Sequence, residues 1–172
     1  MANTDQARGF IPVGHLTGGE IRPRAYRLDN ESNYISKGDM LKQNPVGRGQ
    51  VTLGAAGDMY NAIGIAAETK NATDVVDDDT ILVWDDPRII YEVQGYTGVT
   101  FDEGMIGETA NHVATAGDTN YGISRQELNG NGGGNEQFYI LGKVDRPGNI
   151  WGEHVKLLVV FNNHRFLTAA TS

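Results

Sequence analysis

Short runs of β-branched and aromatic residues, separated by turn-forming residues, are the feature of this sequence that most restricts its fold. The runs recur at intervals of about 8 to 12 residues, which is typical of β-sandwiches and barrels. They span residues 50–54, 58–68, 80–84, 89–95, 98–101, 138–144 and 154–162. The chain has 23 glycines, which supply turns between the runs. We therefore expect an all-β protein that folds as a compact barrel or sandwich.

Two segments favour other local structures. Residues 102–114 place four residues, Met105 and Val113 among them, near one face of a helix, with acidic residues in the first turn. The glycines in this segment limit the expectation to one short helix at most. Residues 34–44 fit a β-hairpin that turns at a Lys-Gly-Asp tripeptide.

The composition is that of one folded domain. The chain has 172 residues, of which 39% are hydrophobic and 21% are charged, well inside the globular range. It has no cysteine, which excludes disulfides, thiolate nucleophiles and cysteine-based zinc sites. The first ten residues lack the pattern of a secretory signal, and no apolar run is long enough to span a bilayer. We expect the protein to stay in the cytoplasm, or in something assembled there, with no membrane partner.

Charge is unevenly distributed along the chain. The net charge is -8, and such a surface repels phosphate backbones, so nucleic acid is not an expected partner. Residues 1–27 hold four arginines and two acidic residues, a net charge of +2. Residues 58–118 hold two basic and thirteen acidic residues, a net charge of -11. The front of the chain is therefore suited to an acidic surface that the middle would repel.

Each sequence motif that could indicate catalysis or ligand binding has a simpler structural interpretation. The glycine-rich stretch 127–138 lacks the following helix and the lysine of a phosphate-binding loop, so we expect a flexible strand connector there. The acidic run 74–80 lacks the spacing of a calcium loop, so we expect a solvated acidic turn. Residues 122–126 lack the trailing glycine of a nucleophile elbow. The four histidines are dispersed and form no metal-binding pair: His15, His112, His154 and His164. We expect no catalytic residue, no metal and no cofactor, and hence no enzymatic activity.

Five stretches, in order, resemble the small cement or decoration proteins of tailed-bacteriophage capsids. They are "GFIPVGHLTGGEIRPRAYRL", "YISKGDML", "WDDPRIIYEVQGYTG", "GISRQEL" and "VVFNNHRF", spread from residue 9 to about residue 166. The resemblance implies a β-rich virion protein made in the bacterial cytoplasm and bound to the outer surface of the head. It also implies the major capsid protein as partner, a homotrimeric state and no catalysis. In this role the protein clamps neighbouring capsomers and stabilises the shell.

The first 24 residues fit an extended arm that precedes a single β-rich domain over residues 25–172. The expected capsid-binding residues are apolar anchors and arginines that pair with shell carboxylates: Phe10, Ile11, Pro12, Val13, Leu16, Arg22, Arg24 and Arg27. The alternative is an edge strand that belongs to the protein's own core, because arms and edge strands look alike in sequence. Large apolar side chains at Trp84, Ile90 and Tyr91 indicate core packing first and a subunit interface second.

Two other functional classes remain open. A head fibre or adhesin would bind host glycans through exposed aromatic side chains. A trimeric all-β nucleotide hydrolase is the enzymatic alternative, because such enzymes assemble shared sites from scattered Asp, Ser and glycine-rich segments.

Deletion of residues 1–24 separates the two interpretations of the front segment. An arm predicts that the truncated protein stays folded, with little change in Tm, while binding to expanded heads is lost. An edge strand predicts unfolding or aggregation first. Circular dichroism melts together with a head-binding assay distinguish these outcomes.

Overall fold

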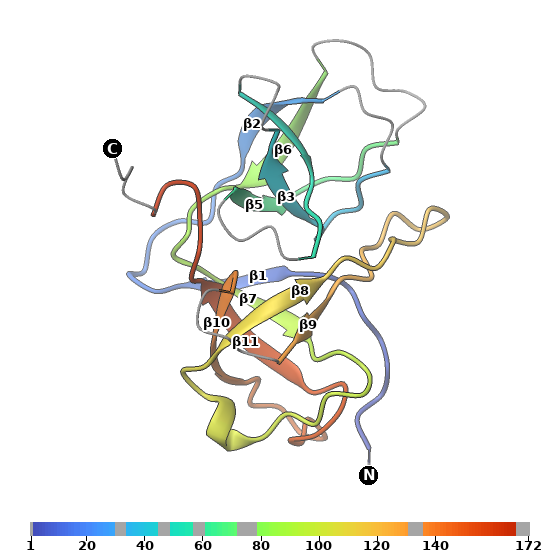
Figure 1. Ribbon diagram of the computed structural model, residues 1–172, viewed down its shortest axis with the longest axis vertical. Coiled ribbons are helices and arrows are strands. Elements are labelled where there is room, and N and C mark those ends of the chain that lie inside the picture. Colours follow the sequence, from blue (N-terminus) through green and yellow to red (C-terminus); the bar gives the residue numbers. More distant parts are fainter. Residues whose placement is uncertain are drawn as a thin grey trace.

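The computed structural model describes residues 2–29, 34–44, 49–56, 61–71, 79–130 and 136–167, and it confirms an all-β fold. Figure 1 shows two β units stacked along the long axis of the molecule. The upper unit is a closed five-stranded barrel, and the lower unit is a curled six-stranded sheet. The described residues contain one helical element, the 3-10 turn η2 at Glu103–Met105, which agrees with the expectation of one short helix at most.

The barrel is built from consecutive strands in the order β2-β4-β3-β5-β6. Their bounds are β2 Arg24–Leu28, β3 Met40–Gln43, β4 Gln50–Leu53, β5 Ala62–Ala66 and β6 Thr80–Trp84. The β2–β4 pair is parallel, and the other pairs are antiparallel. Closure leaves the barrel with no free sheet edge, which rigidifies it and removes a route to strand-mediated aggregation.

The six-stranded sheet has the antiparallel order β1-β7-β11-β10-β8-β9. Its strands are β1 Ile11–His15, β7 Ile89–Gln94, β8 Thr109–Val113, β9 Glu127–Asn129, β10 Phe138–Lys143 and β11 Lys156–Phe161. The sheet curls so that the residue after β7, Gly95, forms a parallel bridge with Leu128 of β9. The strand β1 pairs with the first half of β7 and lies at one edge of the sheet.

The two units share a core because β3 and β5 lie between them. Every residue of β5 is buried. Its pairing with β3 shifts register between Gly64 and Ala62, so side chains two residues apart on β5 face different cores. Ile63 packs inside the barrel, whereas Ile65 and Met40 join the core of the six-stranded sheet. Gly64 allows the neighbouring barrel strand β6 to lie close to β5: a Cβ atom there would lie 2.2 Å from the carbonyl oxygen of Trp84.

A cluster of aromatic side chains forms the centre of the shared core. Phe10 is fully buried and stacks on Phe138, with 4.5 Å between the ring centroids. Phe138 contacts Phe161 in turn, and Tyr91 meets both Phe10 and Phe161 edge-on. The backbone N–H of Phe10 donates to the carbonyl oxygen of Gly38 in the barrel unit. Phe10 therefore connects the N-terminal segment to both units.

The expected arm is corrected by this arrangement. Residues 11–15 form β1, which pairs with β7, and Phe10 lies in the core, so the body of the protein begins well before residue 25. Residues 2–8 form no strand, but they lie against the six-stranded sheet (Figure 1). The Asn3 side chain donates to the carbonyl oxygens of Ile150 and Glu153, which holds this segment in place.

Three further local expectations are also corrected. Residues 109–113 form the strand β8 rather than a helix, because they pair with β9 and β10. The Lys-Gly-Asp turn is present, with Gly38 at a φ of 96°, but Ile35 pairs with Lys70 and β3 pairs with β4 and β5, so no hairpin forms. Part of the expected connector over residues 127–138 is β9. Residues 74–78 of the acidic run 74–80 and residues 131–135 of the glycine-rich stretch lie outside the described residues.

Replacing Phe10 with alanine tests its position in the core. We expect Phe10→Ala to lower the free energy of unfolding by about 3–5 kcal/mol, because a buried aromatic ring leaves a cavity among its neighbours. Val13→Ala on the same strand is the matched control, since Val13 is 49% exposed, and its effect should stay within about 0.5 kcal/mol. Urea denaturation measures both, and equal effects would contradict the core position of Phe10.

Candidate functional site

The structure separates the residues expected to bind the capsid. Phe10 is in the core, whereas Ile11, Val13 and Leu16 are exposed large apolar residues. Pro12 is partly buried. The predicted anchors therefore divide into one that holds the fold together and four with surface available to a partner.

The predicted arginines are less free to pair with a partner than the sequence indicates. The guanidinium of Arg22 lies 2.5 Å from the carboxylate of Glu20, and that of Arg24 lies 3.2 Å from the carboxylate of Asp85. Arg22 and Glu20 are both mostly exposed, so that pair contributes little to stability. Arg24 is mostly exposed, whereas its partner Asp85 is buried. Arg27 is also exposed, on β2.

The expected interface residues also have different positions. Tyr91 is fully buried, and its hydroxyl donates to the carbonyl oxygen of Trp84 over 3.2 Å, so it is not available to another subunit. Ile90 is half-buried beside β1. Trp84, at the end of β6, keeps part of its ring at the surface. Of the three residues, Trp84 is the one that lines a surface groove.

A groove of about 590 Å³ runs along the junction between the two units. Its apolar wall includes Ile11 and Pro12 from β1 and Trp84 from β6. Its rim includes Lys37 and Arg8. Tyr121 and Ile123 also line the groove, together with Gly38, Thr69 and Gly122. We call this surface the junction groove.

A hairpin over residues 118–123 forms one side of the junction groove. Asp118 and Ile123 pair as an antiparallel bridge, and the Asp118 carboxylate accepts from the N–H of Asn120 and from the Arg125 guanidinium. Figure 1 shows this segment as a projection on one side of the molecule, level with the junction. Tyr121 lies within the hairpin and is 78% exposed.

Hydrogen bonds to the barrel unit fix this 118–123 hairpin in place. The hydroxyl of Thr69 donates to the carbonyl oxygen of Gly122 over 2.8 Å, and it accepts from the N–H of Lys37 over 3.0 Å. The two sides of the junction groove are thus joined through one threonine. A fixed loop with an exposed tyrosine is suited to binding, because little conformational entropy remains to be lost.

A second cluster contains metal-ligating residue types. One ligand atom each of Asp5, Glu127 and His154 lies within 4.8 Å of the others. The Gln94 amide nitrogen contacts all three, at 2.7 Å from Asp5, 2.7 Å from Glu127 and 3.4 Å from His154. The Gln94 amide oxygen accepts from the N–H of Gln6, which fixes the orientation of the amide. The Gln94 amide therefore occupies the position that a cation would take.

Two charged groups at this cluster, Glu127 and Lys156, are destabilised by partial burial. Burial raises the pKa of Glu127 and lowers the pKa of Lys156, whose ammonium donates to the amide oxygen of Gln94. Lys156 also donates to the carbonyl oxygen of Gln6. The arrangement fastens residues 5 and 6 to the six-stranded sheet.

A buried acid, Asp39, directly follows the Lys37–Gly38 segment that lines the junction groove. One carboxylate oxygen of Asp39 accepts from the N–H of Ser36 over 2.8 Å, while the other, Oδ1, has no hydrogen-bond partner among the described residues. Burial raises the pKa of Asp39 to about 6, although bonds from Ser124 and Ser36 oppose the shift. His164 shows the opposite effect, since burial lowers the pKa of its imidazole to about 4.

No family model, curated protein or solved structure matches this chain. Within the described ranges, no helix has the length and apolar character needed to cross a membrane.

The raised pKa of Asp39 predicts a pH-dependent stability. Because the folded pKa of about 6 lies above the unfolded value of about 3.9, ionised Asp39 destabilises the fold, and this cost disappears as the pH falls from 6 to 4. At pH 8, Asp39→Asn should therefore raise the free energy of unfolding by about 3 kcal/mol, at about 1.4 kcal/mol per pKa unit. Near pH 4 the difference should vanish.

Urea denaturation across this pH range measures the effect, with Asp145→Asn at an exposed position as the control. The wild-type profile alone is less informative, because His164 opposes Asp39. Because the folded pKa of His164 is about 4, protonation of this residue in the unfolded chain lowers the free energy of unfolding as the pH falls from 6.5 to 4. A gain from Asp39→Asn that is the same at pH 8 and pH 4 would contradict the proposed charge effect.

Proposed function

We propose that this protein is a structural component of a bacteriophage virion that binds the outer surface of the head and clamps neighbouring capsomers. The ordered resemblance of five sequence stretches to capsid cement proteins is the starting point for this proposal. The partner is then the major capsid protein, and the protein acts as a homotrimer on the particle. Light scattering of the purified protein tests the trimer, and a monomer both in solution and on the particle would contradict it.

The structural observation that supports the proposal best is the junction groove. It combines exposed apolar residues, an aromatic ring and two cations on one face, and it spans both β units. Clustered aromatic and apolar side chains beside arginine or lysine are typical of protein-binding surfaces. A protein-binding face on a rigid body is what a clamp requires.

The all-β construction fits a mechanical role. Each unit contains a strand pair that is far apart in sequence, β2 with β6 and β1 with β7, and the two units share a buried core through β3 and β5. Force applied at one unit is therefore transmitted through packed side chains rather than through a linker. Such a body resists separation of the capsomers that it contacts.

The exposed side chain of Tyr121 also favours a second candidate, host binding by a head fibre or adhesin. Sugar rings bind well to exposed aromatic faces, and Tyr121 is 78% exposed. The two functions differ in their partner: a clamp binds purified heads, whereas an adhesin binds host cells or their glycans. Measuring both with the same protein preparation separates them.

Tyr121→Ala tests the role of the 118–123 hairpin in binding. We expect co-sedimentation with expanded heads of the phage that encodes this protein to weaken at least about tenfold, because an exposed tyrosine at a rigid position is a typical binding hot spot. The Tm should stay unchanged, since Tyr121 packs little against the body.

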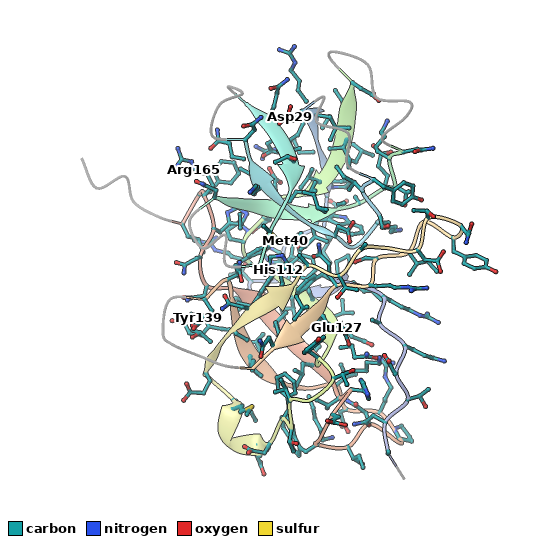
Figure 2. The ribbon with its side chains drawn as sticks, turned by 45° about the vertical axis from the view of Figure 1, so that its right-hand side comes forward. Asp29, Met40, His112, Glu127, Tyr139 and Arg165 are labelled. Carbon is teal, nitrogen blue, oxygen red and sulfur yellow. The ribbon has the colours of Figure 1, made fainter. Side chains whose placement is uncertain are left out.

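Tyr139→Ala is the matched control for this experiment. Tyr139 is also exposed, and Figure 2 shows it on the side of the molecule opposite the projecting hairpin. The control should bind heads as the wild-type protein does. Equal losses in both variants, or none in either, would argue against a role for the hairpin.

A further inference from the structure

We propose that the junction groove binds an extended acidic segment of a partner protein, with one apolar side chain of that segment placed against Trp84. The inference extends the proposed function, because the segment then belongs to a shell subunit. It specifies the chemistry of the bound partner, which the resemblance leaves open. Its test uses the isolated protein, so that it can fail separately from the binding of heads.

Charge is the first argument. Arg8 and Lys37 are the charged side chains among the described residues that line the junction groove, and both are exposed. The chain as a whole carries a net charge of -8. A cationic groove on an acidic protein attracts carboxylates locally while the remaining surface repels them, which directs an acidic segment to this place.

The apolar wall is the second argument. Trp84, Ile11 and Pro12 form the apolar wall of the groove, and Trp84 also packs against the main core. Aromatic rings that are fixed on one side and exposed on the other are suited to hold an apolar side chain. The groove therefore fits a segment in which an apolar residue lies between acidic ones.

Lys37 places its positive charge next to the apolar wall of the groove. Its ammonium lies 5.6 Å from the centre of the Trp84 ring, so the ring and the cation form one surface. A bound carboxylate pairs with Lys37, and the neighbouring apolar side chain contacts Trp84. The Trp84 ring then reports on binding directly.

The groove is also preorganised on both sides. Gly38 and Gly122 have positive φ angles of 96° and 65°, and Thr69 joins the two segments by hydrogen bonds. At Gly38 a Cβ atom would lie 2.9 Å from the carbonyl oxygen of Arg8, so the turn and the N-terminal segment are in close contact. Binding therefore requires little ordering of the protein.

A single-stranded nucleic acid is the competing ligand, because it combines negative charge with stacking rings. The net charge of -8 opposes it, since a nucleic acid carries one charge per nucleotide and reaches beyond the two cations. A short segment with a few carboxylates places its charge where Arg8 and Lys37 are. We therefore favour the protein segment, and the experiment includes the nucleic acid as an arm.

The test is a fluorescence titration in which Trp84 is the sole tryptophan. The chain has two tryptophans, so the variant Trp151→Phe isolates Trp84. The probe is an acetylated, amidated pentapeptide with two glutamates on either side of a leucine. We expect a saturable change in Trp84 emission that weakens with added salt, and dissociation constants at least about tenfold higher for Lys37→Glu and for Arg8→Glu.

Matched controls define the outcomes that count against the inference. Lys143→Glu on β10 makes the same charge change away from the groove, and it should leave the affinity unchanged. A pentapeptide with lysines in place of the glutamates should not bind. Calorimetric titration of the unmodified protein gives the same affinities without Trp151→Phe, in case that variant folds poorly.

Three results would overturn the inference. The first is no binding of the acidic peptide in either measurement, and the second is an affinity of the Lys37→Glu and Arg8→Glu variants equal to that of the protein without these changes. The third is binding of oligothymidine at least as tight as that of the peptide. The proposed function is judged separately. Heads that bind the wild-type protein while the acidic peptide does not would reject the groove inference alone. A peptide that binds while heads do not would reject the capsid role and leave the acidic-segment site in place.

Discussion

The stacking of Phe10 on Phe138 is the interaction on which the rest of the structure depends. It buries the tenth residue of the chain among side chains of β7, β10 and β11, and it brings the backbone of Phe10 to the carbonyl oxygen of Gly38. Gly9 makes this approach possible, because its φ is 67° and a Cβ atom there would lie 2.3 Å from the Ser124 hydroxyl. The N-terminal segment thereby joins the two β units.

Bringing the two units together also buries polar side chains at the junction. These side chains bond to backbone groups that the strands leave unpaired: the Gln126 amide oxygen accepts from the N–H of Met40, and the His164 imidazole bonds to the carbonyl oxygen of Ile63. Met40 and His112, both labelled in Figure 2, share Gly54 as a partner: the Gly54 N–H donates to the carbonyl oxygen of Met40, and the His112 ring nitrogen lies 3.4 Å from the carbonyl oxygen of Gly54. Two of the four histidines are thus buried at the junction, where they contribute hydrogen bonds to the fold.

The same junction produces the groove on which our functional proposals rest. Once β1 and the end of β6 are fixed against each other, Ile11 and Trp84 form an apolar wall, and the 118–123 hairpin stands beside it. The junction groove is therefore a consequence of how the two units pack. Its rigidity follows from the same contacts that stabilise the core.

The sequence by itself determined the fold class and most of the long strands. The strands β4, β6, β7, β10 and β11 lie where β-branched and aromatic residues recur, because pairing within a sheet selects such side chains at close range. Tertiary structure alone decided that Phe10 is buried in its own chain, that residues 109–113 pair as β8, and that Tyr91 is internal while Trp84 reaches the surface. Local sequence encodes the tendency of a segment to be extended and apolar, but the partner that covers it comes from residues distant along the chain. The junction groove brings together Arg8, Lys37, Trp84 and Tyr121, whose proximity arises only when the barrel and the sheet pack against each other.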